Sequence, residues 1–410
     1  KIEINNLINT NISIIGGGKS GIASAKLAKH LGAKVFISEN NKSYNDQYNI
    51  NNFNHEIGQH SDRILESEII IISPGISNDI PIIKKCKNNN IPIISEIEFA
   101  SWFTKSPILA ITGSNGKTTT INLLHNMCIC DGKTSLLGGN VGIPFSENVL
   151  WELKSNIKTA VHILEISSFQ LENVKLFSPL ISCILNITPD HLDRHSNFNE
   201  YINRKLTLAK QTKSNGFIIY NEEDKILKKE LSHLNNSRKF SSTDEDVYFQ
   251  LNATKVFSYN KLNKPETLFK LNETKLKGIH NIQNILAAAT MANLFDISNT
   301  AIRNGIINFC PIQHRMEWIG NLNNVDYFND SKATNIAATK AAIESFNTNL
   351  IIILGGQNKG KTNFKDLIPS LKNRSKVIIA YGKAGKEIER QFNDQFNVLY
   401  IESFEKAVLT

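Results

Sequence analysis

Short apolar runs that alternate with helical patterns dominate this chain, and the alternation starts anew in three places. Residues 12–16 and 34–39 are predicted strands on either side of a helix over residues 20–32. A further strand is predicted over residues 68–76, where it ends in a loop. Because each strand can return to its sheet through the following helix, this order favours a parallel, doubly wound sheet. Residues 40–54 are rich in Asn and are predicted to form a solvated loop or a poorly ordered one.

The strand–helix pattern restarts twice, which predicts three α/β domains, at residues 1–105, 106–310 and 311–410. A chain of 410 residues is long enough to bury a core in each of them. Within the second domain, residues 221–275 are polar and weakly patterned, which predicts a mixed insertion of short strands. The two later domains hold the remaining predicted elements, which are strands over residues 107–113, 160–167, 180–188, 327–331, 349–356 and 376–382, and helices over 118–132 and 280–295.

Composition narrows the class of protein and its compartment. The 5 cysteines are scattered and odd in number, so we expect buried, reduced thiols in a cytoplasmic protein. No apolar run reaches the ~18 residues of a membrane span, and we expect no signal peptide. The net charge is +8, but no basic run is interleaved with aromatic residues, so we expect no nucleic-acid partner. A substrate that carries phosphates and carboxylates suits this charge better.

The segment TGSNGKTTT, Thr112 to Thr120, is the strongest candidate for chemistry, because a predicted strand precedes it and a predicted helix follows it. Its glycines allow backbone N–H groups to surround phosphate oxygens, and the helix N-terminus adds partial positive charge. Lys117 would reach the β- and γ-phosphates and Thr118 would bind Mg²⁺. Ile111 stands where the general P-loop pattern has a glycine, so the loop is a short variant. The alternative is a glycine-rich turn with a chance GKT.

Polar residues follow further predicted strands of the second domain. Glu165 ends a buried strand, at the position where a P-loop protein places a carboxylate beside its Mg²⁺, although a solvated Glu is the alternative. The cluster GGNVG, residues 138–142, suits a simple turn as well as a site in which Asn140 holds a ligand oxygen. The segment NITPDHLDRH presents carboxylates and imidazoles at a strand end, where α/β sheets bind ligands, and these are Asp190, His191, Asp193 and His195.

In the third domain, the segments HRME and NDSKATN bring Arg315, Asp330 and Lys332 into a dense charged group. These residues would neutralise phosphoryl charge if they face the P-loop, and they form an ordinary pair of solvated loops if they do not.

The first domain carries a dinucleotide-type fingerprint. Gly16, Gly18 and Gly21 follow a predicted strand in the pattern GxGxxG, and Glu39 lies about 20 residues further on, where it would meet a ribose. The segment SPGI, residues 73–76, supplies a second loop. This pattern raises the alternative of a nicotinamide-dependent oxidoreductase, but an oxidoreductase gives no reason for a P-loop in the next domain.

Taken in order, the motifs resemble one family along nearly the whole chain. They are TGSNGKTTT, GGNVG, LEISSFQLE, NITPDHLDRH, HNIQN, HRME and NDSKATN, and they occur with the order and spacing of the Mur ligases. SPGI, SSFQLE, DHLDRH and above all DSKATN are most similar to the members that add D-glutamate. The resemblance implies a Rossmann-like UDP-binding domain, a central P-loop ATPase domain and a Rossmann-like glutamate-binding domain. It also implies ATP-dependent addition of D-glutamate to UDP-N-acetylmuramoyl-L-alanine through an acyl phosphate, with ADP and phosphate as products.

The resemblance also implies roles for individual residues. Those implied to bind ATP are Gly113, Ser114, Asn115, Gly116, Lys117, Thr118, Thr119, Asn281, Asn284, Arg315 and Asp330. Those implied to bind the other two substrates are Lys19, Ser20, Glu39, Asn40, Gly75, Asn140, Ser167, His191, Lys332, Thr334 and Lys359. Two Mg²⁺ ions are implied at Thr118, Glu165, His191 and Lys205, the last as a carbamate. The implied catalytic residues are Lys117, His191, Lys205 and Arg315.

The chain departs from the family pattern at its end. The family closes with a Ser- and Phe-containing motif, roughly LSPxxxSxDxF, and this chain stops at Thr410 without it, so we expect a truncated third domain. The rival functions are a ligase for another amino acid or for folate, a catalytically silent nucleotide-binding module, and an oxidoreductase. We also expect a monomer whose third domain closes onto the other two.

Overall fold

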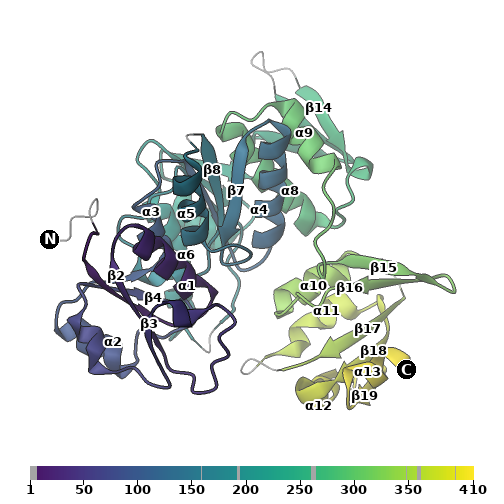
Figure 1. The fold of residues 1–410 in the computed structure, drawn as a ribbon. Helices are drawn as coiled ribbons and strands as arrows, with labels where there is room; N and C mark the ends of the chain where they lie inside the picture. Colours follow the sequence, from purple (N-terminus) through teal and green to yellow (C-terminus); the bar gives the residue numbers. More distant parts are fainter. Residues whose placement is uncertain are drawn as a thin grey trace.

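The computed structural model contains three parallel sheets, which follow one another along the chain (Figure 1). The purple N-terminal part and the yellow C-terminal part both lie below the teal and green central part in this view. No helix within the described ranges is both long enough and apolar enough to cross a membrane. The structure describes residues 7–157, 159–191, 194–259, 265–347, 349–357, 362–392 and 394–410.

The first sheet has the order β3-β2-β1-β4-β5, and every neighbouring pair is parallel. The chain adds β2 and β3 on one side of β1, and then adds β4 and β5 on its other side. The loops after β1 and β4 therefore lie next to each other at the carboxyl edge of the sheet. β4 reads IIII and is buried throughout, as expected for a strand covered on both faces. The elements are β1 (Asn11–Ile15), α1 (Lys19–His30), β2 (Lys34–Glu39), η1 (Ile50–Asn52), β3 (Asn54–Ile57), η2 (Asp62–Glu66), β4 (Ile69–Ile72), α2 (Pro81–Asn88), β5 (Ile93–Ser95) and α3 (Glu96–Ser101).

The central sheet has the order β11-β10-β9-β6-β8-β7 and is parallel throughout. β6 lies inside the sheet between β8 and β9, so the loops that follow these three strands are neighbours. The elements are β6 (Ile108–Thr112), α4 (Lys117–Cys130), β7 (Thr134–Gly139), α5 (Phe145–Ser155), β8 (Ala160–Glu165), η3 (Gln170–Asn173), β9 (Ile181–Ile184), α6 (Phe198–Gln211), β10 (Phe217–Asn221), α7 (Lys225–Leu231), β11 (Ser237–Phe240), α8 (Ile279–Leu294) and α9 (Asn299–Ile307).

The mixed insertion predicted over residues 221–275 is confirmed only in its later part, which forms a small antiparallel sheet, β12-β13-β14, whereas β11 joins the central sheet. It comprises β12 (Phe249–Asn252), β13 (Lys255–Tyr259) and β14 (Pro265–Lys270), and η4 (Leu271–Glu273) follows it. The prediction that all five cysteines are buried is wrong for two of them. Cys86, Cys128 and Cys183 are buried, but Cys130 and Cys310 are exposed. Cys128 and Cys130 lie on one helix, and residues two apart on a helix point in different directions.

The C-terminal part holds the parallel sheet β17-β18-β19 and a separate antiparallel hairpin, β15-β16. Asn323 and Asn324 form the hairpin turn with φ of 53° and 61°, and Asn tolerates this left-handed conformation better than most residues. Apolar hairpin side chains such as Trp318 remain exposed. The elements are β15 (Glu317–Leu322), β16 (Val325–Asn329), α10 (Ile336–Glu344), β17 (Leu350–Gly355), η5 (Phe364–Leu367), α11 (Ile368–Leu371), β18 (Ser375–Tyr381), α12 (Gly382–Phe392), β19 (Val398–Ile401) and α13 (Phe404–Leu409).

Candidate functional site

The TGSNGKTTT loop joins β6 to α4, as its sequence predicts. Gly113 and Gly116 have φ of +158° and +85°. A Cβ at Gly116 would lie 2.2 Å from Oδ1 of Asn284 on α8, so the helix packs directly against the loop backbone. Both the backbone conformation and this close approach therefore require glycine at position 116.

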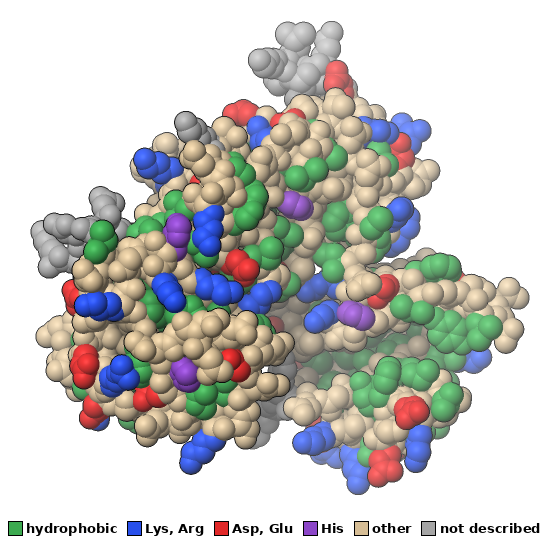
Figure 2. Space-filling model, viewed as in Figure 1, with side chains coloured by type: hydrophobic (Ala, Val, Ile, Leu, Met, Phe, Trp, Pro, Cys, Tyr) green, Lys and Arg blue, Asp and Glu red, His purple; other side chains and the backbone are tan. Residues whose placement is uncertain are grey.

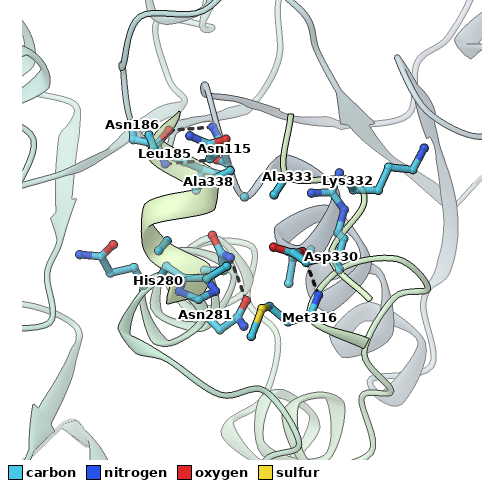
Figure 3. Close-up of a pocket in the computed structure, with 18 of the residues that line it drawn as sticks. Asn115, Leu185, Asn186, His280, Asn281, Met316, Asp330, Lys332, Ala333 and Ala338 are labelled. Atoms are coloured by element: carbon cyan, nitrogen blue, oxygen red, sulfur yellow. Dashed lines mark hydrogen bonds between the residues drawn. The ribbon is translucent and has the colours of Figure 1, made fainter. Parts of the chain in front are cut away.

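Residues that follow β9 hold the loop in place from the other side. The backbone N–H of Asn115 donates to Oδ1 of Asn186 at 2.8 Å, and Nδ2 of Asn186 donates to the Asn115 carbonyl at 3.1 Å. Figure 3 shows this pair at one side of the cavity. Ser114 is buried, and its hydroxyl donates to the Thr188 carbonyl at 2.9 Å. The sequence did not single out Asn186, although its position just after a buried strand was a signal.

Thr118, in the first turn of α4, lies beside Glu165, the last residue of β8. The Thr118 hydroxyl donates to Oε2 of Glu165 at 2.8 Å, and Nδ2 of Asn140 donates to Oε1 of Glu165 at 2.9 Å. Nη2 of Arg315, from the C-terminal part, donates to the Thr118 hydroxyl at 2.9 Å. Glu165 is only 2% exposed. A buried carboxylate beside a hydroxyl provides the hard oxygen atoms that Mg²⁺ prefers, so these residues fit such an ion.

Two lysines converge on the same carbonyl group. Nζ of Lys117 donates to the Gly113 carbonyl at 2.7 Å, and Nζ of Lys205 donates to it at 2.8 Å. Burial lowers the pKa of both lysines, and the charge of Lys117 lowers the pKa of Lys205 further. The carboxylates of Asp190 and Glu165 oppose both shifts. Lys205 is 2% exposed, so a charged ammonium group there is costly.

The NITPDHLDRH segment is only partly arranged as the sequence predicted. The His191 backbone has φ of 54°, its N–H donates to Oδ1 of Asp190 at 2.9 Å, and its ring lies edge-on to Phe169. The His195 side chain does not join this group. It is only 3% exposed, and its ring stacks on the ring of Phe169. The two imidazoles therefore contact the same Phe169 ring, but His195 is buried whereas His191 is partly exposed. The predicted participant Asp193 lies outside the described residues.

A cavity of about 250 Å³ opens beside the P-loop, between α8 and the C-terminal part (Figure 3). Nδ2 of Asn284 donates to Oδ1 of Asn281 at 3.3 Å on one wall. On another wall, Oδ1 of Asp330 accepts from the Met316 N–H at 3.0 Å, and burial raises the pKa of Asp330. The sequence did not single out the largely apolar part of the lining, which includes Phe240, Leu276, His280, Ile312, Ala337, Ala338, Ala341 and Ala342.

The first domain carries its own loop site, as its fingerprint predicts. Oε2 of Glu39 accepts from the Gly17 N–H at 2.8 Å, which ties the end of β2 to the glycine-rich turn. A Cβ at Gly21 would lie 1.9 Å from the Gly16 carbonyl oxygen, so glycine there permits close packing of helix on strand. Ser20 lies in the first turn of α1 next to this turn, whereas Asn40 is exposed.

Two cationic side chains tie this loop site to the central domain. Nζ of Lys19 donates to the Gly142 carbonyl at 2.7 Å, and Nη1 of Arg194 donates to the Gly75 carbonyl at 3.0 Å. Figure 2 shows Lys and Arg side chains in a row across the middle of this face, where the two domains meet. The role of Arg194 was not predicted, because nothing local in the sequence shows that it reaches another domain.

The remaining predicted residues lie at different distances from this site. The Ser167 N–H and hydroxyl both donate to Oε1 of Gln170, just after β8. Lys332 lines the cavity, and Thr334 is exposed near the start of α10. Lys359 lies outside the described residues.

The fold and the site define a nucleotide-binding α/β protein in which a P-loop domain lies between a dinucleotide-type domain and a third α/β domain. Three family models match the chain in sequence. They are the Mur ligase MurD-like N-terminal domain at residues 10–95, the Mur ligase middle domain at 111–292, and the Mur ligase glutamate ligase domain at 314–410. The chain belongs to the Mur ligase family, which confirms the resemblance read from its motifs.

Similar proteins extend along nearly the whole chain. The UDP-N-acetylmuramoylalanine–D-glutamate ligase of Koribacter versatilis is 35% identical and covers 97% of this chain and 88% of the relative. The ligase of the same name from Chloroherpeton thalassium is 33% identical over 97% of this chain and 89% of its own length. The structure of MurF ligase from Thermotoga maritima in complex with ADP has a TM-score of 0.58, 14% identity, and coverage of 100% of this chain and 95% of that one.

Proposed function

We propose that this protein is an ATP-dependent ligase of the cytoplasm that joins D-glutamate to UDP-N-acetylmuramoyl-L-alanine in peptidoglycan precursor synthesis. ADP and phosphate are the other products. The observation that carries this proposal is the identity of 33% and 35%, over 97% of the chain, to relatives named for this reaction. The P-loop, which includes Thr118 and lies next to Glu165, supports the use of ATP.

The alanyl carboxylate is a poor acylating agent, so it must first be activated. Its oxygen attacks the γ-phosphorus of ATP, and ADP leaves as the acyl phosphate forms. The D-glutamate amine then attacks the acyl carbon, and phosphate leaves. Because the first step brings two anions together, the protein's main task is to neutralise charge and to align the reactants. Lys117 and Arg315 are cations at the P-loop, and the loop N–H groups add further donors.

Two Mg²⁺ ions fit the oxygen-rich side of this site, where they would neutralise phosphate charge. Thr118 and Glu165 would hold one of them, and His191 with a carbamylated Lys205 would hold the other. Among the described residues, no three His, Cys, Asp or Glu side chains form a ready-made metal cage. The other ligands would therefore be phosphate oxygens and water, as is usual for Mg²⁺.

The environment of Lys205 supports its carbamylation. Burial and the neighbouring Lys117 lower the pKa of Lys205, which favours the neutral amine. The amine nitrogen adds to the carbon of CO₂ with loss of one proton to solvent, and the resulting carbamate is an anion with two oxygen atoms. That anion would attract Lys117, whereas an ammonium group at Lys205 would repel it.

The remaining residues divide between the two other substrates. The proposed domains are residues 1–105 for the UDP part, 106–310 for ATP and 311–410 for D-glutamate. We assign the uridine and pyrophosphate to Lys19, Ser20, Glu39, Asn40 and Gly75. We assign the alanyl end of the substrate to Asn140, Ser167 and His191, and D-glutamate to Lys332, Thr334 and Lys359.

Phosphate release by the purified chain tests the function directly. We expect release only when ATP, Mg²⁺, UDP-N-acetylmuramoyl-L-alanine and D-glutamate are all present. Replacement by L-glutamate, by other amino acids or by a folate tests the rival ligases, and calorimetry with UDP and NAD tests the oxidoreductase alternative. Release that does not depend on D-glutamate would contradict the proposal, and light scattering would test the proposed monomer.

A further inference from the structure

Asn335 lies where the C-terminal part of the chain touches the P-loop domain. It is the last residue of the NDSKATN segment, and the proposed function gives it no role. We propose that Asn335 is a positioning residue that latches the third domain onto the P-loop and Asp190. This inference rests on the proposed function, because the latched arrangement is the one in which the third domain presents D-glutamate to the phosphorylated substrate.

The two polar atoms of the Asn335 side chain make hydrogen bonds to different domains. Its Oδ1 accepts the Ala338 N–H at 2.8 Å and so caps the first turn of α10. Its Nδ2 donates to Oδ1 of Asn115 at 3.1 Å and to Oδ2 of Asp190 at 3.1 Å. The oxygen therefore fixes the side chain to its own domain, while the nitrogen holds two residues of the central domain. Figure 3 shows Asn115 next to Ala338, where these two domains meet.

Both acceptors belong to the site itself. Asn115 is part of the P-loop and is held by Asn186. Asp190 accepts the His191 N–H on its other oxygen, and its negative charge raises the pKa of both buried lysines, Lys117 and Lys205, against the effect of burial. The Asn335 amide donates to Asp190 and so orients that carboxylate. Docking of the third domain and the charge balance around the lysines are thus linked through one amide group.

Arg315 makes another hydrogen bond across this interface, to Thr118. Asn335 differs from it in one respect that makes a test possible. Its helix-capping task needs only a side-chain oxygen, which Ser and Asp also provide, whereas its latching task needs the amide nitrogen. Substitutions can therefore remove the latch and leave the cap.

Asn335→Ser keeps the cap and removes the amide donor, because the shorter serine side chain ends at its capping oxygen. Asn335→Asp keeps the cap and places a carboxylate against Asp190. We expect both to retain the melting temperature of the parent within a few degrees, to lower kcat by about tenfold or more, and to change the KM for ATP little, since a hydrogen bond to a charged group is lost. In small-angle X-ray scattering of the full chain, we expect a larger radius of gyration, most of all for Asn335→Asp.

The exchange Asn335→Asp with Asp190→Asn supplies the matched control. It restores an amide–carboxylate pair with the donor on the opposite domain, and Asn115 can rotate its amide to donate as well. We expect the double variant to recover the parent's radius of gyration even if its activity stays low, because Asp190 has its own effect on the lysines.

Two results would overturn the latch. One is an unchanged radius of gyration in both single variants, and the other is a loss of activity that appears only as a raised KM for ATP, which would mean that Asn335 contacts the nucleotide. The scattering measurement does not depend on turnover. A parent protein that shows the latch but no ligase reaction would therefore refute the proposed function and not this inference.

Discussion

Replacement of Gly116 by Ala should destabilise the fold for two reasons, which are backbone strain and a steric clash with Asn284. An Ala at φ of +85° is in a left-handed conformation, which costs about 1–2 kcal/mol. Its Cβ would also lie 2.2 Å from Oδ1 of Asn284, so that side chain must leave its rotamer at a further cost of about 0.5–1.5 kcal/mol. We therefore expect Gly116→Ala to lower the free energy of unfolding of the central domain by about 1.5–3.5 kcal/mol.

Gly132→Ala is the matched control, because Gly132 has φ of +75° at the other end of α4 and no atom within 4 Å of an added Cβ. It should show the backbone cost alone, in urea unfolding followed by fluorescence. Gly116→Ala should also weaken ADP binding in calorimetry, whereas Gly132→Ala should not. Equal destabilisation of the two variants, together with normal ADP binding by Gly116→Ala, would refute this account of the loop.

Three further substitutions test the site and the domain interface. Lys117→Ala should lower kcat by a factor that corresponds to at least ~2.7–4 kcal/mol of lost transition-state stabilisation, and near-normal turnover would remove Lys117 from the mechanism. Lys205→Ala should be nearly inactive and partly restored by acetate, which supplies the missing oxygen atoms; full activity in bicarbonate-free buffer would exclude a carbamate. Glu96 is buried between α3 and α5 with one oxygen unpaired, and burial raises its pKa to about 7. Since an unfolded carboxyl ionises near pH 4.5, the parent loses stability between pH 4.5 and about 7. Glu96→Gln should therefore gain stability relative to the parent as the pH rises through that window, by up to about 3 kcal/mol, and a pH-independent difference in urea midpoints would contradict the assignment.

Local features of the sequence were sufficient for the elements that carry the site. Buried parallel strands read as continuous apolar runs, which is why β1, β6 and β8 were predicted within a few residues. The P-loop could also be predicted locally, because its glycines, lysine and threonine lie close together in the sequence, where they lead from a strand into a helix. The motifs, taken in order, also predicted the family correctly.

Other features depend on which side of an element faces the protein interior. The strand predicted over residues 327–331 is β16, and it pairs in an antiparallel hairpin instead of joining a parallel sheet. His195 was predicted to face the site with His191, but it is buried against Phe169. Cys130 was predicted to be buried, but it is exposed. In each case the residue type was compatible with both environments, and only the packing of neighbouring elements distinguished them.

The sequence by itself determined the order of the α/β units, the P-loop and the family. The tertiary structure decided how separate segments meet. Asn186 supports the P-loop, Arg194 reaches Gly75, and Asn335 reaches Asp190, each across many residues of chain. Such hydrogen bonds leave no periodic or local trace, because an Asn or Arg in a loop has the same sequence signature whether it faces solvent or another domain. Their existence depends on a relative placement of domains that only the folded chain fixes.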